Sequence, residues 1–227
     1  MSNNLSNLKY WYLEKFDFTQ KLCKSERLHM EKSMVMKKVD KNTMLHFPEM
    51  KERYVYFLKE GMVKIVHYNE DGRETIKYLL SPGNIFGELA LLENDEDSND
   101  YAIAVDNCVI CFMDVESMNK MMLENNELNI SIRKLIGLRL KRLETRLESL
   151  IFKDAQTRIV EFLYELFREF GKKEGQVVKI KNFLTHDEIA KLTASSRQTV
   201  TSVLNSLRNK GIISYSSKYI ELKEPSI

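Results

Sequence analysis

Two short amphipathic segments lie in tandem in the sequence Leu184-Thr-His-Asp-Glu-Ile-Ala-Lys-Leu-Thr-Ala-Ser-Ser-Arg-Gln-Thr-Val-Thr-Ser-Val-Leu-Asn-Ser-Leu207. Thr185 can cap the first segment, and Glu188 stands three residues later, as a capping box requires. Apolar residues recur at helical spacing in both segments, and only Thr193-Ala-Ser195 separates them. Such a short link between two helices is typical of a helix-turn-helix.

The second segment begins with side chains that can contact DNA, in the turn Ser196-Arg-Gln-Thr199. Arginine pairs bidentately with guanine and glutamine with adenine, whereas small hydroxyls and helix N-terminal amides suit phosphate. Residues 211–222, with a polar turn at Ser216-Ser217, predict a hairpin in which Lys218 can reach the DNA backbone. A plain helical hairpin is the alternative. The order of two helices, a glycine and a two-stranded wing favours a winged helix-turn-helix.

An apolar seam precedes this region. Its residues alternate spacings of four and three, which is a heptad pattern; they are Ile136, Leu140, Leu143, Leu147 and Leu150. We expect a long helix over residues 126–151. The helix could pack on the core of its own chain, but so narrow a stripe favours pairing with a copy of itself.

The front half of the chain predicts short strands. Apolar runs at 54–58, 62–68, 75–80 and 103–112 are separated by turn signals such as Asp71-Gly72 and Ser81-Pro-Gly83. Strands at this spacing suggest a small antiparallel barrel or jelly roll. We therefore expect an α+β chain with a β-roll domain at 1–125, a dimerisation helix at 126–151 and a winged helix-turn-helix domain at 152–227.

Composition and charge agree with a DNA-binding protein. The chain has 227 residues and a net charge of +2, yet residues 152–227 carry 13 Lys and Arg against 9 Asp and Glu, leaving 22 against 24 elsewhere. A basic C-terminal part suits a polyanion, although chance could give the same asymmetry. No apolar run is long enough to span a membrane and no signal peptide begins the chain, so we expect a cytoplasmic protein.

Other function classes find little support. No nucleophile, base or metal constellation converges, so the chain is not expected to be an enzyme. Histidines are scattered without ligand spacing, so no metal site is predicted. Cys108 and Cys111 fall in a predicted strand, where residues three apart face opposite sides; they are interpreted as buried structural cysteines. A cyclic-nucleotide-binding domain of a protein that does not bind DNA is a further alternative, but such a protein would lack the helix-turn-helix.

Together these segments resemble the catabolite-activator/FNR (Crp/Fnr) family of bacterial transcriptional regulators. Residues 184–207 with Gly211-Ile-Ile213 are similar to its winged helix, and Gly83-Asn-Ile-Phe-Gly-Glu-Leu-Ala-Leu-Leu92 is similar to its cyclic-nucleotide phosphate-binding cassette. Asp154 to Ile159 also match, and the resemblance runs from about Lys38 onward. It implies a homodimer on a pseudo-palindromic operator, controlled through the β-roll by an unidentified small-molecule effector, with RNA polymerase as a candidate partner.

By position, the resemblance places Arg197, Gln198 and Ser202 on the base-reading face and Thr199 among the phosphate contacts. Members that read a common TGTGA-type half-site have glutamate at the position of Gln198 and a second arginine at that of Ser202, and Ala194 replaces a frequent turn glycine. The full set of predicted DNA contacts is Thr185, Ser196, Arg197, Gln198, Thr199, Ser202 and Lys218.

The effector pocket departs from the cyclic-AMP pattern. The family's ribose-binding glutamate is present as Glu88, which could equally be structural, but its phosphate-binding Arg-Ser pair falls on Ser98 and Asn99, among four carboxylates between Asn94 and Asp100. These acids could bind a cation, but a solvated loop is the preferred interpretation. The adenine-binding Thr-Ser pair falls on Leu143 and Glu144, so cyclic AMP is not expected to bind tightly and no cofactor is predicted. The candidate pocket residues are Gly87, Glu88, Leu89, Ser98, Asn99 and Leu143.

Overall fold

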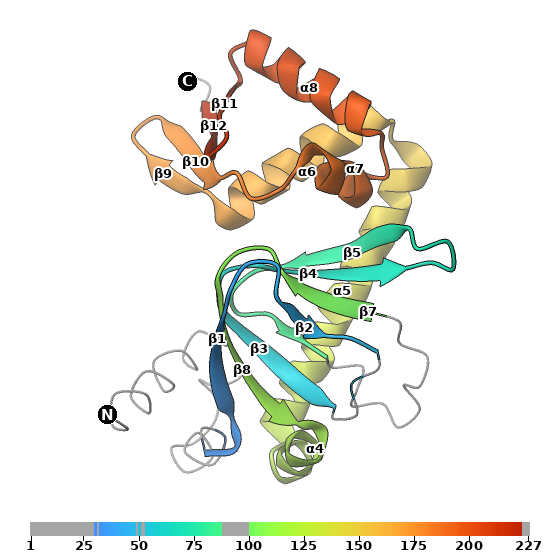
Figure 1. Cartoon of the computed structure of the whole chain (residues 1–227), viewed down its shortest axis with the longest axis vertical. Helices are drawn as coiled ribbons and strands as arrows, with labels where there is room; N and C mark the ends of the chain where they lie inside the picture. Colours follow the sequence, from blue (N-terminus) through green and yellow to red (C-terminus); the bar gives the residue numbers. More distant parts are fainter. Residues whose placement is uncertain (1–29, 31, 49, 51–52, 88–99, 224–227) are drawn as a thin grey trace. The chain divides into compact units, whose positions relative to one another are not determined.

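The computed structural model describes residues 30, 32–48, 50, 53–87 and 100–223 (Figure 1). The chain divides into two compact units, Met1–Lys141 and Arg142–Ile227. One long helix, α5 (Asn126–Phe152), contains the point of division. The division predicted from the sequence, into domains at 1–125, 126–151 and 152–227, stays a prediction.

The first unit contains two antiparallel sheets of four strands each. One sheet has the order β1-β8-β3-β6 and is built from β1 (Val35–Val39), β8 (Cys108–Asp114), β3 (Tyr54–Glu60) and β6 (Ile85–Phe86). The other has the order β2-β7-β4-β5 and is built from β2 (Met44–His46), β7 (Asp100–Ala104), β4 (Val63–Tyr68) and β5 (Glu74–Leu80). This is the expected β-roll.

Strand β3 shows how one sheet serves two cores. Tyr56 and Leu58 point into the interior of the roll, whereas Val55 and Phe57 point toward the helices on the other side. That second core includes Met118 and Met121 of α4 (Val115–Glu124), and Leu128 and Ile132 of α5. Both faces of the strand are therefore buried, which explains its nearly continuous apolar sequence.

The two cysteines of β8 confirm the alternation expected from the sequence. Cys108 belongs to the roll interior and Cys111 to the core under the helices, and both are free, buried thiols. Burial raises the pKa of the Cys108 thiol, whose Sγ lies 3.2 Å from the carbonyl oxygen of Met62. Cys23 lies outside the described residues.

The predicted strand at 103–112 is wrong in one respect, because it is two strands. β7 ends at Ala104 and β8 begins at Cys108. Between the two strands, the backbone amide of Val105 donates to the carbonyl oxygen of Met62, and the backbone amide of Asn107 donates to the carboxylate of Asp106. A turn of only three residues between two apolar strands leaves little trace in a hydropathy pattern. Strands β1, β2 and β6 and helix α4 were not predicted either.

The second unit packs three helices against a sheet. The helices are α6 (Ala155–Phe170), α7 (His186–Thr193) and α8 (Arg197–Asn209). The sheet has the order β11-β12-β10-β9, with β11 (Ile213–Tyr215), β12 (Tyr219–Lys223), β10 (Val177–Lys181) and β9 (Lys172–Glu174). Figure 1 shows α7 and α8 as consecutive helices followed by the β11–β12 hairpin. This is the expected winged helix-turn-helix.

The segment at 171–175 follows helix α6 directly. It contains β9, which pairs with β10 across the two-residue turn Gly175-Gln176. Gly175 has a φ of +64°, a left-handed conformation that glycine adopts without steric cost. β9 was missed because all three of its residues are charged and exposed.

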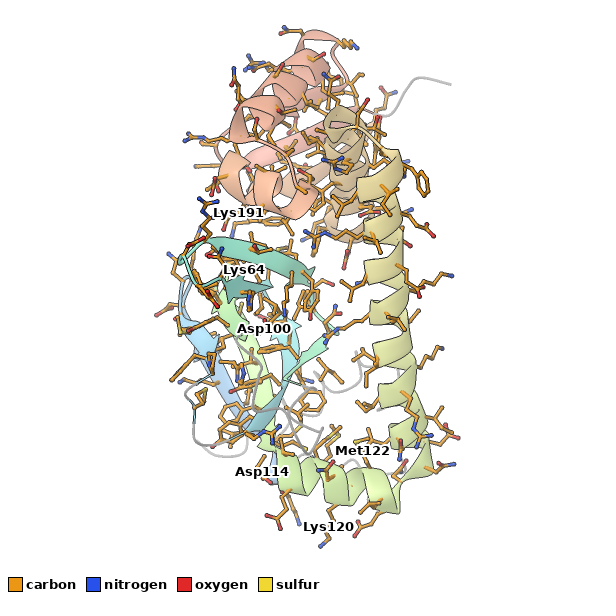
Figure 2. The ribbon with its side chains drawn as sticks, turned by 90° about the vertical axis from the view of Figure 1, so that its right-hand side faces the viewer. Lys64, Asp100, Asp114, Lys120, Met122 and Lys191 are labelled. Carbon is orange, nitrogen blue, oxygen red and sulfur yellow. The ribbon has the colours of Figure 1, made fainter. Side chains whose placement is uncertain are left out.

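Helix α4 begins at a cap that titrates. Figure 2 labels Asp114 at the junction of β8 and α4, where its carboxylate accepts hydrogen bonds from the backbone amide (2.7 Å) and hydroxyl (2.8 Å) of Ser117. These bonds favour the ionised carboxylate and hold the pKa of Asp114 below its ordinary value.

We expect Asp114→Ala to lower the free energy of unfolding by about 1 kcal/mol at neutral pH. A lowered folded-state pKa contributes stability that is present above the ordinary carboxyl pKa of about 4 and is lost as pH falls through the folded value. The deficit should therefore shrink below pH of about 4 in urea titrations. Asp114→Asn, which keeps an acceptor oxygen without a charge, is the control and should show a smaller dependence on pH. A deficit in the alanine variant that stays constant with pH would contradict the assignment.

Candidate DNA-binding surface

Helix α7 begins at the expected capping box. The amide of Glu188 donates to Oγ1 of Thr185 (3.2 Å), and the amide of Thr185 donates to Oε2 of Glu188 (2.9 Å). The Thr185 hydroxyl also donates to that carboxylate, at 3.0 Å. In this arrangement Thr185 has no free hydrogen for a phosphate. The structure therefore supports its capping role, and its predicted DNA contact would require the hydroxyl to leave Glu188.

The turn between α7 and α8 depends on a left-handed residue. Ala194 has φ 48° and ψ 51°, a conformation that costs a residue other than glycine roughly 1–2 kcal/mol. The guanidinium of Arg158, in α6, holds the turn in place. Its Nε donates to the carbonyl oxygen of Thr193 (2.9 Å), and its Nη2 donates to the carbonyl oxygen of Ala194 (2.8 Å). Its Nη1 donates to the carbonyl oxygen of Lys153 at 2.7 Å.

Arg158 is a functional residue that sequence reasoning missed. It lies 35 and 36 residues from its partners in the turn, and backbone carbonyls leave no mark in a sequence. The nearest signal was Asp154, which caps α6 by accepting from the amide of Thr157 at 2.7 Å. That cap fixes the start of α6, about one helical turn before Arg158.

The N-cap and first two turns of α8 present the predicted side chains in two groups. Arg197, Gln198 and Ser202 are exposed. Ser196 and Thr199 instead pair with each other: the Ser196 oxygen accepts from the Thr199 amide at 3.0 Å, and the two hydroxyls lie 2.8 Å apart. Only one hydroxyl hydrogen is used within the pair, so the other can be donated to a phosphate.

The wing holds Lys218 at its tip. The hairpin closes through the amide of Ser216, which donates to the carbonyl oxygen of Tyr219 at 2.9 Å. Asn182, directly after β10, stabilises this hairpin. Its backbone amide donates to the carbonyl oxygen of Lys218 (2.8 Å), and its side-chain amide donates to the carbonyl oxygen of Ser216 (3.0 Å). Lys218 itself is exposed, so its ammonium is free to approach a phosphate.

Charge is unevenly distributed over this unit. Exposed cations lie on α8 and just after its end, on the wing and on strands of the sheet; they are Arg197, Arg208, Lys210, Lys218, Lys172, Lys173, Lys181 and Lys223. Lys179 is ion-paired, since its Nζ lies 3.4 Å from Glu174 and 3.6 Å from Glu221. The recognition helix and the wing thus both carry exposed cations, which suits a polyanion.

Polar side chains of the first unit interact around Asp100 and Tyr78. Nζ of Lys77 lies 2.6 Å from the buried carboxylate of Asp100, labelled in Figure 2, and His67 lies 3.5 Å from it. The guanidinium of Arg139 donates to the carbonyl oxygen of Ile85 and lies 5.5 Å from the Tyr78 ring. Burial raises the pKa of Tyr78, and the charge of Arg139 opposes that effect.

Two of the six predicted pocket residues can be placed. Gly87 has a φ of +74°, and a Cβ added there would lie 2.4 Å from the carbonyl oxygen of Tyr54, so the backbone conformation requires glycine. Leu143 is half exposed on α5, in the second compact unit. Glu88, Leu89, Ser98 and Asn99 lie outside the described residues, as do the acids at 95–97. The pocket stays a prediction.

Two domain models match the chain. A cyclic nucleotide-binding domain matches residues 36–125 and a Crp-like helix-turn-helix domain matches residues 157–226. The global nitrogen regulator of Nostoc sp. is 32% identical over 192 residues, covering 84% of this chain and 86% of that protein. The CRP-like cAMP-activated global transcriptional regulator of Mycobacterium tuberculosis is 28% identical over 75% of each chain.

Solved structures share the architecture. A mutant form of CooA from Carboxydothermus hydrogenoformans has a TM-score of 0.68 and 27% identity, covering 85% of each chain. A c-di-GMP-responsive regulator, CLP of Xanthomonas campestris, has a TM-score of 0.73 at 18% identity and covers 89% of this chain and 99% of its own, which shows the fold alone.

A β-roll joined through a long helix to a winged helix-turn-helix defines a class of DNA-binding transcriptional regulators. With matches to both domain models and to full-length relatives, the chain belongs to the Crp/Fnr family within that class. No described helix is both long and apolar enough to cross a membrane.

We expect Arg158→Lys to lower the free energy of unfolding of the winged helix-turn-helix by about 1–3 kcal/mol. An ammonium cannot donate to the carbonyl oxygens of Thr193 and Ala194 together as the planar guanidinium does, so at least one of the two loses its charged donor. Urea titration followed by far-ultraviolet circular dichroism measures the change. Arg168→Lys, at an exposed position of the same helix, should have little effect. Equal effects of the two variants would show that the paired hydrogen bonds of the Arg158 guanidinium do not stabilise the unit.

Proposed function

We propose that the chain is a sequence-specific transcriptional regulator that binds a pseudo-palindromic operator as a homodimer, under the control of a small-molecule effector bound by its β-roll. The observation that carries DNA recognition is the exposed set Arg197, Gln198 and Ser202 on α8, beside the basic wing. RNA polymerase is proposed as the partner through which bound regulator acts, and the cytoplasm as the compartment.

The long helix supports the dimer. All five residues of the heptad seam, from Ile136 to Leu150, are between 41% and 59% exposed in the single chain. A leucine or isoleucine side chain contributes about 1.5–3 kcal/mol on full burial, so a second copy of the helix is the natural partner for this seam.

Replacing both Leu143 and Leu147 by Lys should convert the protein to a monomer, since charges would face each other across the paired helices. Analytical ultracentrifugation at micromolar concentration measures the outcome. Leu138→Lys is the matched control: Leu138 is 54% exposed on the same helix but lies off the seam, so this variant should stay dimeric. Wild-type protein that sediments as a monomer would refute the proposal.

Base reading is tested by selecting operators from randomised duplexes. The half-sites should lie about one helical turn, roughly 10–10.5 base pairs, apart. Arg197→Ala should cost about 1–3 kcal/mol per half-site and relax preference at one base pair, most plainly at a guanine. Arg208→Ala, which removes the same charge about three turns further along α8, should leave the selected sequence unchanged.

Lys218→Ala should act differently, because a phosphate contact carries no sequence information. It should weaken binding to all duplexes alike and lower the slope of log affinity against log salt by about one. Identical sequence preferences in wild type and Arg197→Ala would assign specificity to DNA deformation instead.

Cyclic AMP should bind weakly, because the resemblance places no arginine at its phosphate. A charge-assisted hydrogen bond contributes about 1.5–3 kcal/mol, so its absence should weaken affinity roughly ten- to hundredfold. Isothermal titration of wild type with cyclic AMP should show no submicromolar binding. The double change Ser98→Arg, Asn99→Ser restores the Arg-Ser pair and should tighten binding; tight binding by wild type would contradict the proposal.

A further inference from the structure

His186, the first residue of α7, joins three elements of the DNA-binding unit. Its Nδ1 lies 2.8 Å from Oγ1 of Thr201, in the second turn of α8, and its Nε2 lies 3.1 Å from the hydroxyl of Tyr215, at the end of β11. The Thr201 hydroxyl in turn donates to the carbonyl oxygen of Arg197 at 2.9 Å. A chain of hydrogen bonds therefore runs from the wing to the first turn of the recognition helix.

The direction of this chain follows from the number of hydrogens. Thr201 has one hydroxyl hydrogen; we assign it to the carbonyl oxygen of Arg197, 2.9 Å away, so that Oγ1 accepts from His186. The imidazole must then carry its proton on Nδ1, and in the neutral ring Nε2 is left as an acceptor for the Tyr215 hydroxyl. Every donor in the chain points from the wing toward the recognition helix, an arrangement in which successive bonds polarise one another.

Both ring nitrogens of His186 are thus occupied, and the side chain is only partly exposed. This arrangement does not favour a direct bond from the imidazole to phosphate. What the ring does is connect the helix that carries Arg197 and Gln198 to the hairpin that carries Lys218, three residues beyond Tyr215. The imidazole of His186 also packs against the ring of Tyr215, with the two ring centroids 5.7 Å apart.

We propose that His186 is a positioning residue for DNA recognition: it fixes the wing relative to the recognition helix, so that base and phosphate contacts form in one register. The inference rests on the proposed DNA binding. Loss of the link should let the wing and α8 contact DNA independently. Binding to any duplex would then be largely kept, whereas discrimination between operator and random DNA would fall.

The chain of bonds is tested first without DNA. Long-range proton–nitrogen NMR of the full-length, nitrogen-labelled protein, at a pH where the ring is neutral, reports which nitrogen of His186 is protonated. We expect Nδ1 to be protonated and Nε2 to be bare. A ring protonated at Nε2 would overturn the proposal, because Tyr215 and Thr201 could not then be linked in the direction described.

The functional test compares variants on operator and random duplexes. Tyr215→Phe removes the bond to Nε2 and keeps the aromatic ring; it should lower the ratio of operator to random affinity roughly three- to tenfold, the value of one hydrogen bond. Tyr219→Phe, the same change on the neighbouring strand of the wing, is the control and should leave the ratio unchanged.

A conservative variant separates positioning from stability. Asparagine can present an amide donor where Nδ1 stands, so His186→Asn keeps the Thr201 bond and should match Tyr215→Phe, and the double variant should lose no more than either single change. An unchanged ratio in Tyr215→Phe, or additive losses in the double variant, would overturn the proposal. Wild-type protein that does not discriminate operator from random DNA would instead refute the proposed function, while the NMR result would still decide the bond network.

Discussion

The DNA-binding surface depends on one guanidinium. Arg158 donates to two consecutive carbonyls of the turn between α7 and α8, and the second belongs to a left-handed alanine. The turn sets the angle between the two helices, and that angle decides whether the first turn of α8 can enter a groove while the wing reaches the backbone. The geometry of this turn is thus held by a residue from another helix.

Polar side chains near the recognition helix divide into two kinds. The hydroxyls of Thr185, Ser196 and Thr199 are engaged in caps, so they place the helix ends and their exposed amides. Arg197, Gln198 and Ser202 remain exposed on α8. A residue type that suits DNA is therefore not enough to assign a contact, because the same hydroxyl can be needed to start the helix.

Elements with a strong local signal were predictable from the sequence. The long helix that carries the heptad seam, the Asp71-Gly72 hairpin and the capping box at Thr185 each depend on neighbours close in the chain, and the structure has all three. The missed parts depend on distant partners. Strands β1, β2 and β6 are short and gain their bonds from strands far along the chain, and β9 is charged throughout. Arg158 could not be predicted as a clamp, because its acceptors are backbone atoms. The pocket at Gly87 was predicted only by resemblance.

The alternation of β8 has a practical consequence. Cys108 and Cys111 are three residues apart on one strand, yet each thiol is enclosed by a different apolar core. An alkylating reagent reaches a buried thiol only when its surroundings open. The rate of modification at each cysteine therefore reports the opening of one core, and the chain carries a natural pair of probes that distinguishes loosening of the roll from detachment of the helices that cover it.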